Sequence, residues 1–263
     1  MFQELITLCT AAAALALPQD WWLAWSFAPV VVVPLAALLC VGWRAGKPPG
    51  TSFVTGWTLL AIALVSPLCR MAATLVSAHM VQLMVLAVAA PVFLSSGGIG
   101  LRLRDAWPTL KTSWPEGRSD IGTAAALYAL VLWIWHVPAV YELTLTSTTA
   151  HVTAYAWLVT VSIWFWQEVL HAPVAARGRV IGVLAATLAH TGFLGAILTF
   201  TPGVLYPVQS AGAAAWQLSA LDDQQLAGLI MWVPGGLAYL AALVALSLKW
   251  WALAATSASG KPA

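Results

Sequence analysis

Residues 77–98 read SAHMVQLMVLAVAAPVFLSSGG, and this stretch contains no Asp, Glu, Lys or Arg. An α-helix rises about 1.5 Å per residue, so a helix of this length crosses the roughly 30 Å hydrocarbon core of a bilayer. A long apolar run without charge is typical of a transmembrane helix. The stretch also contains His79, and an ionisable side chain inside a membrane is costly and usually functional.

The whole chain shares this apolar character. Of its 263 residues, 61% are hydrophobic and only 8% are charged, and the mean hydropathy is +0.87. Soluble domains carry about 25% charged residues, so most of this surface must face lipid. The net charge is only +2, and the basic residues are scattered over loops, which gives no indication of a nucleic-acid partner.

Apolar runs bounded by Pro, Gly and charge predict an all-α, polytopic bundle with about seven transmembrane helices. Residues 21–251 would form this transmembrane domain, and 252–263 a flexible cytoplasmic tail. Residues 1–20 are a short apolar segment for which a signal-like core and an interfacial helix fit about equally well. The expected spans lie near residues 22–42, 53–69, 73–95, 121–141, 150–170, 179–201 and 223–248.

Lys and Arg in alternate loops predict the orientation of the bundle. The longest loop, 96–120, is interpreted as a polar linker and carries Arg102, Arg104, Lys111 and Arg118. The loops after the fourth and sixth spans carry no Lys or Arg. This bias places the C-terminus in the cytoplasm and the N-terminus outside, and we expect a multi-pass protein of a bacterial inner membrane.

Three histidines fall at a similar depth near the outer face. His79 lies in the first third of the third span, His136 lies late in the fourth, and His151 opens the fifth. One such histidine would most simply bond a backbone carbonyl. Three at one depth favour a shared site, because intramembrane ionisable residues are costly.

Met80 and Met84 follow His79 on the same helix. Imidazole and thioether together suit Cu(I), although a methionine pair one turn apart is also a common packing element. The cysteines Cys9, Cys40 and Cys69 are far apart and form no CxxC motif. Neither a disulfide framework nor a thiolate metal site is therefore expected.

Other polar residues accompany the histidines at the outer face. Glu142 follows the fourth span, and Asp223 and Gln224 open the seventh. An Asp there can cap the helix, but these groups can also orient the imidazoles through hydrogen bonds or dock a partner. His190 lies deeper, in the sixth span, and is interpreted as a supporting or packing residue.

Four stretches of the chain resemble one known family. They are SAHMVQLMVLAVAAPVFLSSGG (77–98), WIWHVPAVYELTL (133–145), AHVTAYAWLVTVSIWFW (150–166) and LDDQQLAGLIMWVPGGLAYL (221–240). Together, and in this order, they are similar to the CtaG family of cytochrome c oxidase assembly factors. This is the seven-helix family associated with caa-type oxidases, and the resemblance runs from Phe53 to Trp251.

The resemblance implies a non-enzymatic membrane factor that matures a haem–copper oxidase and handles copper at the outer face. Its partners would be membrane lipids and an immature oxidase subunit. Two positions depart from the family pattern, because Leu83 and Tyr155 stand where a second histidine usually follows the first by one helical turn. The positions that match the pattern are His79, Met80, His136, His151, Asp223 and Gln224.

Other functions fit part of the pattern. The chain contains no GxSxG, HExxH or phosphate-binding loop, so these enzyme classes are not expected. A structural or accessory subunit of a respiratory complex without metal would use the histidines only for internal hydrogen bonds. A small-solute or metal transporter would need a polar path across the bilayer, and a haem protein would use two histidines as axial ligands.

Overall fold

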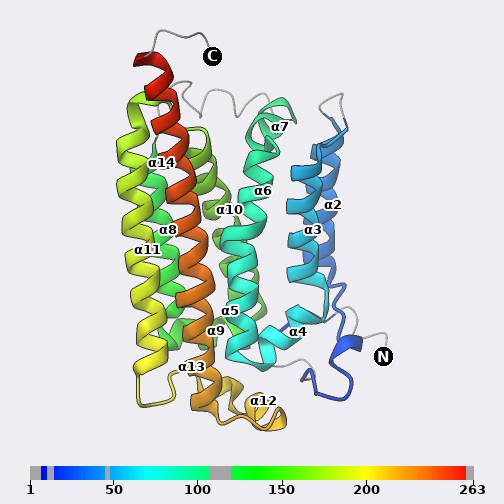
Figure 1. Cartoon of the computed structure of the whole chain (residues 1–263). Helices are drawn as coiled ribbons and strands as arrows, with labels where there is room; N and C mark the ends of the chain where they lie inside the picture. The colour runs from blue at the N-terminus through cyan, green and yellow to red at the C-terminus, as the bar shows by residue number, and fades with distance from the viewer. Residues whose placement is uncertain (1–6, 11–14, 45–47, 107–119, 259–263) are drawn as a thin grey trace.

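The protein was analysed as a computed structural model, which describes residues 7–10, 15–44, 48–106 and 120–258. The described residues are helical, without any strand, which confirms the all-α prediction. Figure 1 shows the helices arranged as an upright bundle, with α7 at one end and α12 at the other. The helices are α2 (Pro29–Arg44), α3 (Thr51–Val65), α4 (Pro67–Thr74), α5 (Val76–Met84), α6 (Ala90–Ser96), α7 (Ile99–Ala106), α8 (Ile121–His136), α9 (Pro138–Thr146), α10 (Thr148–Leu170), α11 (Arg177–Phe200), α12 (Ser210–Ala215), α13 (Ala220–Ile230) and α14 (Gly236–Ala258), with short turns at η1 (Trp21–Leu23), η4 (Val174–Ala176) and η5 (Pro207–Gln209).

Three continuous helical runs in the described residues are long and apolar enough to cross a membrane: Val76–Ser96, Val174–Phe200 and Ala220–Leu253. Two bent pairs, α3 with α4 and α8 with α9, raise that number to five if each pair forms one span. The two further expected spans correspond to α2 and α10, which run beside the others in Figure 1. That α2 and α10 cross the membrane, and that the spans number seven, stay predictions.

The bent pairs correct two of the predicted spans, which the apolar pattern alone presents as single straight helices. The axis turns by 50° between α3 and α4 and by 79° between α8 and α9. Pro67 and Pro138 each follow an extended residue and occupy the first turn of the second helix. Proline lacks the N–H that a continuing helix needs and pushes the residue before it out of the helical region, so each span breaks there.

Two long spans contain a π-helical turn where one extra residue is accommodated. The first, η2 (Val85–Ala89), joins α5 to α6, and the second, η6 (Met231–Gly235), joins α13 to α14. In the first turn the carbonyl of Ala87 accepts hydrogen bonds from Tyr128 Oη (3.1 Å) and Trp166 Nε1 (3.0 Å). These side chains satisfy a carbonyl that would otherwise be buried in hydrocarbon with too few donors.

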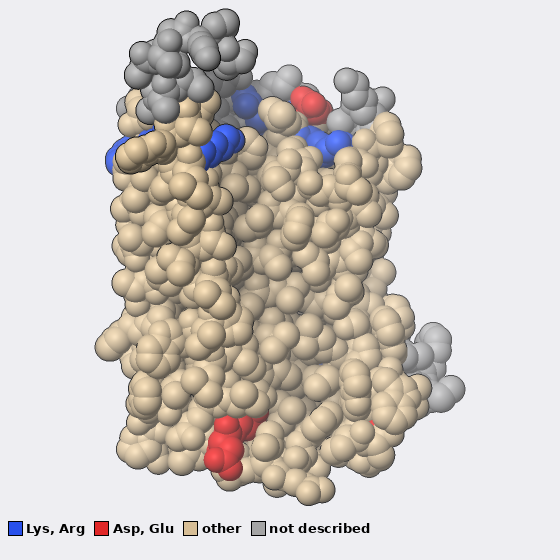
Figure 2. Space-filling model, viewed as in Figure 1, with Lys and Arg blue, Asp and Glu red and all other residues tan. Residues whose placement is uncertain are grey.

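Charged residues separate toward the two ends of the bundle. On the face in Figure 2, Lys and Arg gather at the end that carries α7, where one acidic patch also lies, and the opposite end shows acidic residues near the start of α13. This distribution agrees with the orientation read from the loops, which stays a prediction. The interpretation of 96–120 as a linker is corrected by α7, while Lys111 and Arg118 lie outside the described residues.

The structure describes part of the segment at each end of the chain. The described part of residues 1–20 contains no helix, and α14 continues to Ala258, beyond the expected start of the tail at residue 252. Cys9 forms a disulfide with Cys69 of α4, with the two Cα atoms 5.7 Å apart. The expectation that the cysteines do not pair is therefore wrong. Their distance along the chain hid the pairing, because the N-terminal segment folds back onto α4.

Candidate functional site

His79 owes its position to the break between α4 and α5. Leu75 is extended between the two helices, and the carboxylate of Asp223 in α13 caps the new start. Asp223 accepts hydrogen bonds from Val76 N (2.7 Å), Ser77 N (3.1 Å) and Ser77 Oγ (2.5 Å). A carboxylate at a helix N-terminus satisfies free N–H groups and complements the helix dipole. Asp223 therefore fixes the first turn of the helix that carries His79.

The imidazole of His79 is held from the opposite end of the same break. Its Nδ1 lies 3.3 Å from the carbonyl oxygen of Ala72 in α4. That oxygen also accepts a hydrogen bond from Gln209 Nε2 (2.7 Å), and Gln209 Oε1 accepts one from Tyr141 Oη (2.8 Å). The ring of Tyr141 packs on His79 with centroids 4.9 Å apart. His79 thus sits in a buried network drawn from α4, α9 and η5.

His136 is the last residue of α8, because Pro138 ends the helix. Its Nδ1 lies 2.6 Å from the carbonyl oxygen of Leu132 one turn earlier, and its own carbonyl accepts a hydrogen bond from Tyr206 Oη (2.9 Å). Tyr206 stacks on Tyr141 with centroids 3.9 Å apart. Burial raises the pKa of the Tyr206 phenol, so this loop residue stays a neutral donor.

His151 lies in the first turn of α10. Ser147 caps that turn, with its Oγ 3.4 Å from Ala150 N. The Nδ1 of His151 lies 3.1 Å from the carbonyl oxygen of Thr144 at the end of α9. All three predicted histidines are therefore buried and fixed by backbone at helix junctions.

The hydrogen bonds also determine which ring nitrogen carries the proton. A carbonyl oxygen only accepts, so Nδ1 must donate in His79, His136 and His151. In the neutral ring, Nε2 then keeps its lone pair. For His136 this atom is buried and has no hydrogen-bond partner. Histidines that bind metals are usually held in this way, with the second nitrogen bonded to a carbonyl or carboxylate.

The structure brings two of the three histidines to one cavity. His79 and His136 line an enclosed space of about 30 Å³ together with Tyr141, Tyr155 and several leucines. His151 does not line this space and instead lines a larger cavity of about 300 Å³ between α2, α3 and α10. Tyr155 lines both cavities, stacks on His151 at 4.2 Å between centroids, and lies edge-on to His79 at 6.3 Å.

The methionines lie elsewhere. Met80 is fully buried and lines neither cavity, and Met84 packs against Gly235 of η6 and lines a separate cavity there. Among the described residues, no three His, Cys, Asp or Glu side chains form a group that could hold a metal ion as they stand. The metal-ligand assignment of the sequence analysis stays a prediction.

The other predicted polar residues support the fold around the site. Gln224 is fully buried; its Oε1 accepts from Leu205 N (2.6 Å) and its Nε2 donates to the carbonyl of Gly203 (3.1 Å). It therefore fixes the loop that presents Tyr206. Burial of Asp223 and Gln224 favours a positioning role over partner docking. Glu142 is partly exposed beside the site, and the half-buried His190 of α11 lines neither histidine cavity.

Residues that the sequence pattern does not single out complete the site. Tyr206 and Gln209 lie in the connection between α11 and α12, where no helical periodicity draws attention to them. Gln82 lies one turn after His79 and accepts a hydrogen bond from Tyr155 Oη (2.7 Å) while donating to the carbonyl of Ala63 (2.7 Å). An amide inside an apolar helix was the available signal for Gln82.

Comparison with known proteins gives one match. Neither the curated proteins nor the solved structures contain a match to this chain. A family model described as cytochrome c oxidase caa3 assembly factor (Caa3_CtaG) matches residues 48–252, which include all three predicted histidines and the polar network around them. This match confirms the resemblance found in the sequence. The chain belongs to the Caa3_CtaG family of cytochrome c oxidase caa3 assembly factors.

Proposed function

We propose that this protein holds Cu(I) at the outer end of its helix bundle and delivers it to an immature haem–copper oxidase subunit in a bacterial inner membrane. Membership of an oxidase assembly family supports the oxidase as the partner. His79 and His136 would be the ligands, because both line the same cavity and both use Nδ1 for a backbone carbonyl. Copper is the cargo in this proposal, and the protein is not an enzyme.

The observation that carries the proposal is the orphaned Nε2 of His136. A buried polar atom without a partner costs about 1–3 kcal/mol, and this one belongs to a residue that lines the cavity. Imidazole nitrogen is a good ligand for copper. A cavity of about 30 Å³ has room for an ion without its hydration shell, which suits Cu(I) better than a strongly hydrated divalent ion.

The hydrogen-bond network would fix the orientation of both ligand side chains. Asp223 fixes the start of α5, and Gln209 shares the Ala72 carbonyl with His79. Tyr206 fixes the end of α8 through the carbonyl of His136. Groups that orient an imidazole in this way typically change metal affinity by about 10–100-fold when removed.

The test is copper stoichiometry of the purified full chain in detergent, with ascorbate to keep copper as Cu(I) and to leave disulfides intact. The parent should hold about one copper per chain, and His79→Ala and His136→Ala should lose it. His171→Ala is the matched control, because His171 also bonds a backbone carbonyl one turn earlier but is exposed at the end of α10.

A parent protein without copper would overturn the copper proposal. If cells lacking the gene still lost oxidase activity, the role would be that of a structural or accessory component without metal. In that case His79→Ala and His136→Ala should lower thermal stability without any effect on copper content.

A further inference from the structure

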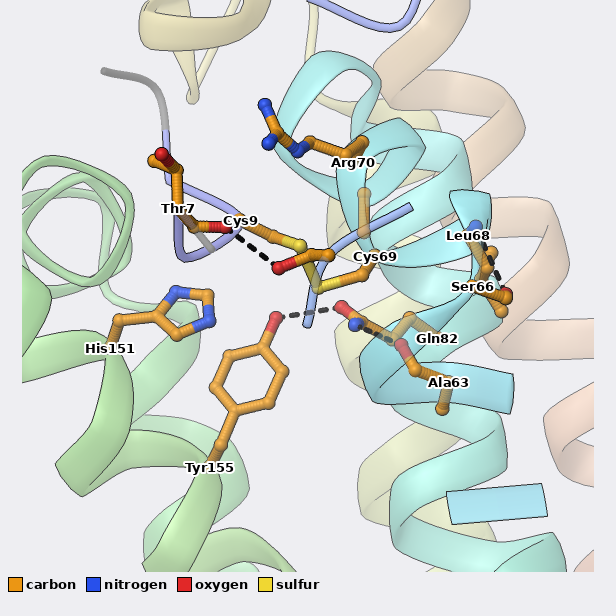
Figure 3. Close-up of a disulfide and its surroundings, with 12 residues drawn as sticks. Thr7, Cys9, Ala63, Ser66, Leu68, Cys69, Arg70, Gln82, His151 and Tyr155 are labelled. Atoms are coloured by element: carbon orange, nitrogen blue, oxygen red, sulfur yellow. Dashed lines mark hydrogen bonds between the residues drawn. A yellow bond between two sulfur atoms is a disulfide. The ribbon is translucent and has the colours of Figure 1, made fainter. Parts of the chain in front are cut away.

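The disulfide lies beside His151, which does not line the His79–His136 cavity. Cys69 and His151 line the same cavity of about 300 Å³, together with Leu8, the residue before Cys9. In Figure 3 the imidazole of His151 extends from α10 toward the disulfide. The Nδ1 of His151 is held by the carbonyl of Thr144, so its Nε2 keeps a lone pair.

The segment around Cys9 is anchored independently of the disulfide. Before Cys9, the carbonyl of Thr7 accepts a hydrogen bond from Ser26 Oγ (2.7 Å). After it, Ala16 N donates to Thr74 Oγ1 (3.0 Å), and Trp216 Nε1 donates to the carbonyl of Ala16 (2.8 Å). Because the segment is held on both sides, reduction of the disulfide would leave the two thiols close to each other, with Cys69 lining the same cavity as His151.

The same groups form a suitable ligand set for Cu(I). Thiolate sulfur and imidazole nitrogen are ligands that a soft monovalent ion prefers. With metal–sulfur bonds of about 2.3 Å, two sulfurs on one ion lie roughly 4 Å apart, which the 5.7 Å separation of the Cα atoms allows.

We propose that the reduced pair Cys9 and Cys69, together with His151, forms a second Cu(I) site that is separate from the His79–His136 cavity and is closed by disulfide formation. A dithiol reductant transfers two electrons and two protons to the disulfide, which yields two thiols and the oxidised reductant. Cu(I) then binds both sulfurs and displaces the two thiol protons. The proposal deepens the copper function and rests on it, because it gives the cargo a redox-controlled point of entry.

The experiment compares the same full chain with its disulfide intact and after reduction by a phosphine that is removed under nitrogen. With Cu(I) supplied alone, the intact protein should bind about one copper per chain and the reduced protein about two. X-ray absorption at the copper edge should show sulfur scattering only in the reduced sample. The parent protein alone gives this comparison, so it does not depend on a variant that folds.

Variants assign the second ion to its ligands. Cys9→Ser and Cys69→Ser should lose the second copper and keep the first, and His151→Ala should weaken the second by about tenfold or more. Cys40→Ser is the matched control, because Cys40 is the exposed free cysteine of α2, and it should keep both ions.

The outcomes separate the two proposals. Equal copper binding before and after reduction, or a second copper that survives Cys69→Ser, would overturn the thiolate site whatever happens at His79. A different outcome would overturn the His79–His136 site and leave the thiolate site standing. In that outcome the parent protein binds no copper with its disulfide intact but binds copper after reduction, and this binding needs Cys9 and Cys69.

Discussion

The imidazole of His151 lies almost flat against the phenol ring of Tyr155, with centroids 4.2 Å apart and ring planes 16° apart. The hydroxyl of Tyr155 donates to Gln82 Oε1 at 2.7 Å, and Gln82 donates to the carbonyl of Ala63. Tyr155 therefore has two effects. Its ring contacts the imidazoles of both His151 and His79, and its hydroxyl connects α10 to α5 and, through Gln82, to α3.

Replacing Tyr155 tests these two effects separately. Tyr155→Phe keeps the aromatic ring but removes the hydrogen bond, so the free energy of unfolding should fall by about 1 kcal/mol and copper binding should not change. Tyr155→His places a second imidazole one turn after His151, where both can reach one ion, and should raise Cu(I) affinity about tenfold. Thermal unfolding and competition with a coloured Cu(I) chelator measure the two quantities. Equal copper affinities in both variants would show that an imidazole at position 155 does not share an ion with His151.

Because Asp223 caps α5, replacing its carboxylate by an amide should lower the stability of the protein considerably. Asp223→Asn removes the negative charge and one acceptor from a fully buried group with three donors around it. The loss should be about 2 kcal/mol, since hydrogen bonds to charged groups contribute more than neutral ones. Thermal unfolding in a fixed detergent measures it.

Asp222→Asn is the control for that experiment. Asp222 is exposed and accepts a hydrogen bond only from Ser219, which caps its own helix α13. Its replacement should change stability by less than about 0.5 kcal/mol. Similar losses in the two variants would show that the carboxylate of Asp223 does not stabilise the start of α5.

Hydrophobic length made the helical class and the approximate spans predictable, because lipid requires each crossing segment to satisfy its own backbone. The breaks within the spans were harder to predict from the sequence. Pro67 and Pro138 are visible in the sequence, but proline in a membrane helix gives either a mild kink or a complete break. The structure gives a 79° turn after His136, which places that residue at a helix end beside His79.

Side-chain partners were predictable only where one helix supplies them. Depth along a span put the three histidines near one face, but depth does not show which rings share a cavity. That His151 lines a different cavity from His79 and His136 depends on how α10 is rotated about its axis. The pairing of Cys9 with Cys69 and the contribution of Tyr206 depend on the paths of connecting segments, which follow no periodic pattern that a sequence reveals.

Close packing of α11 on α13 predicts opposite results for two glycines of α11. A Cβ at Gly195 would lie 2.9 Å from the carbonyl oxygen of Gly228 and from backbone of Trp232, whereas a Cβ at Gly192 would meet only the Trp232 ring at 3.6 Å. Gly195→Ala should therefore destabilise by about 1–3 kcal/mol, because the helices must separate. Gly192→Ala should be neutral or stabilise by up to about 1 kcal/mol through helix propensity. Thermal unfolding measures the change in stability of both variants. Destabilisation of both by the same amount would contradict the close contact between the two helices at Gly195.

The disulfide predicts a simple labelling pattern that also bears on orientation. In denatured but unreduced protein only Cys40 should react with a maleimide, and after reduction Cys9 and Cys69 should react as well, which intact-protein mass spectrometry resolves. Cys40→Ser should remove the first label and leave the other two.

Disulfides persist in oxidising compartments, and this one lies at the end of the bundle opposite α7 and its arginines. The positive-inside rule places those arginines in the cytoplasm, so both arguments put Cys9 and Cys69 outside. Three labels without reduction, in protein from cells that form disulfides normally, would contradict both the pairing and this orientation.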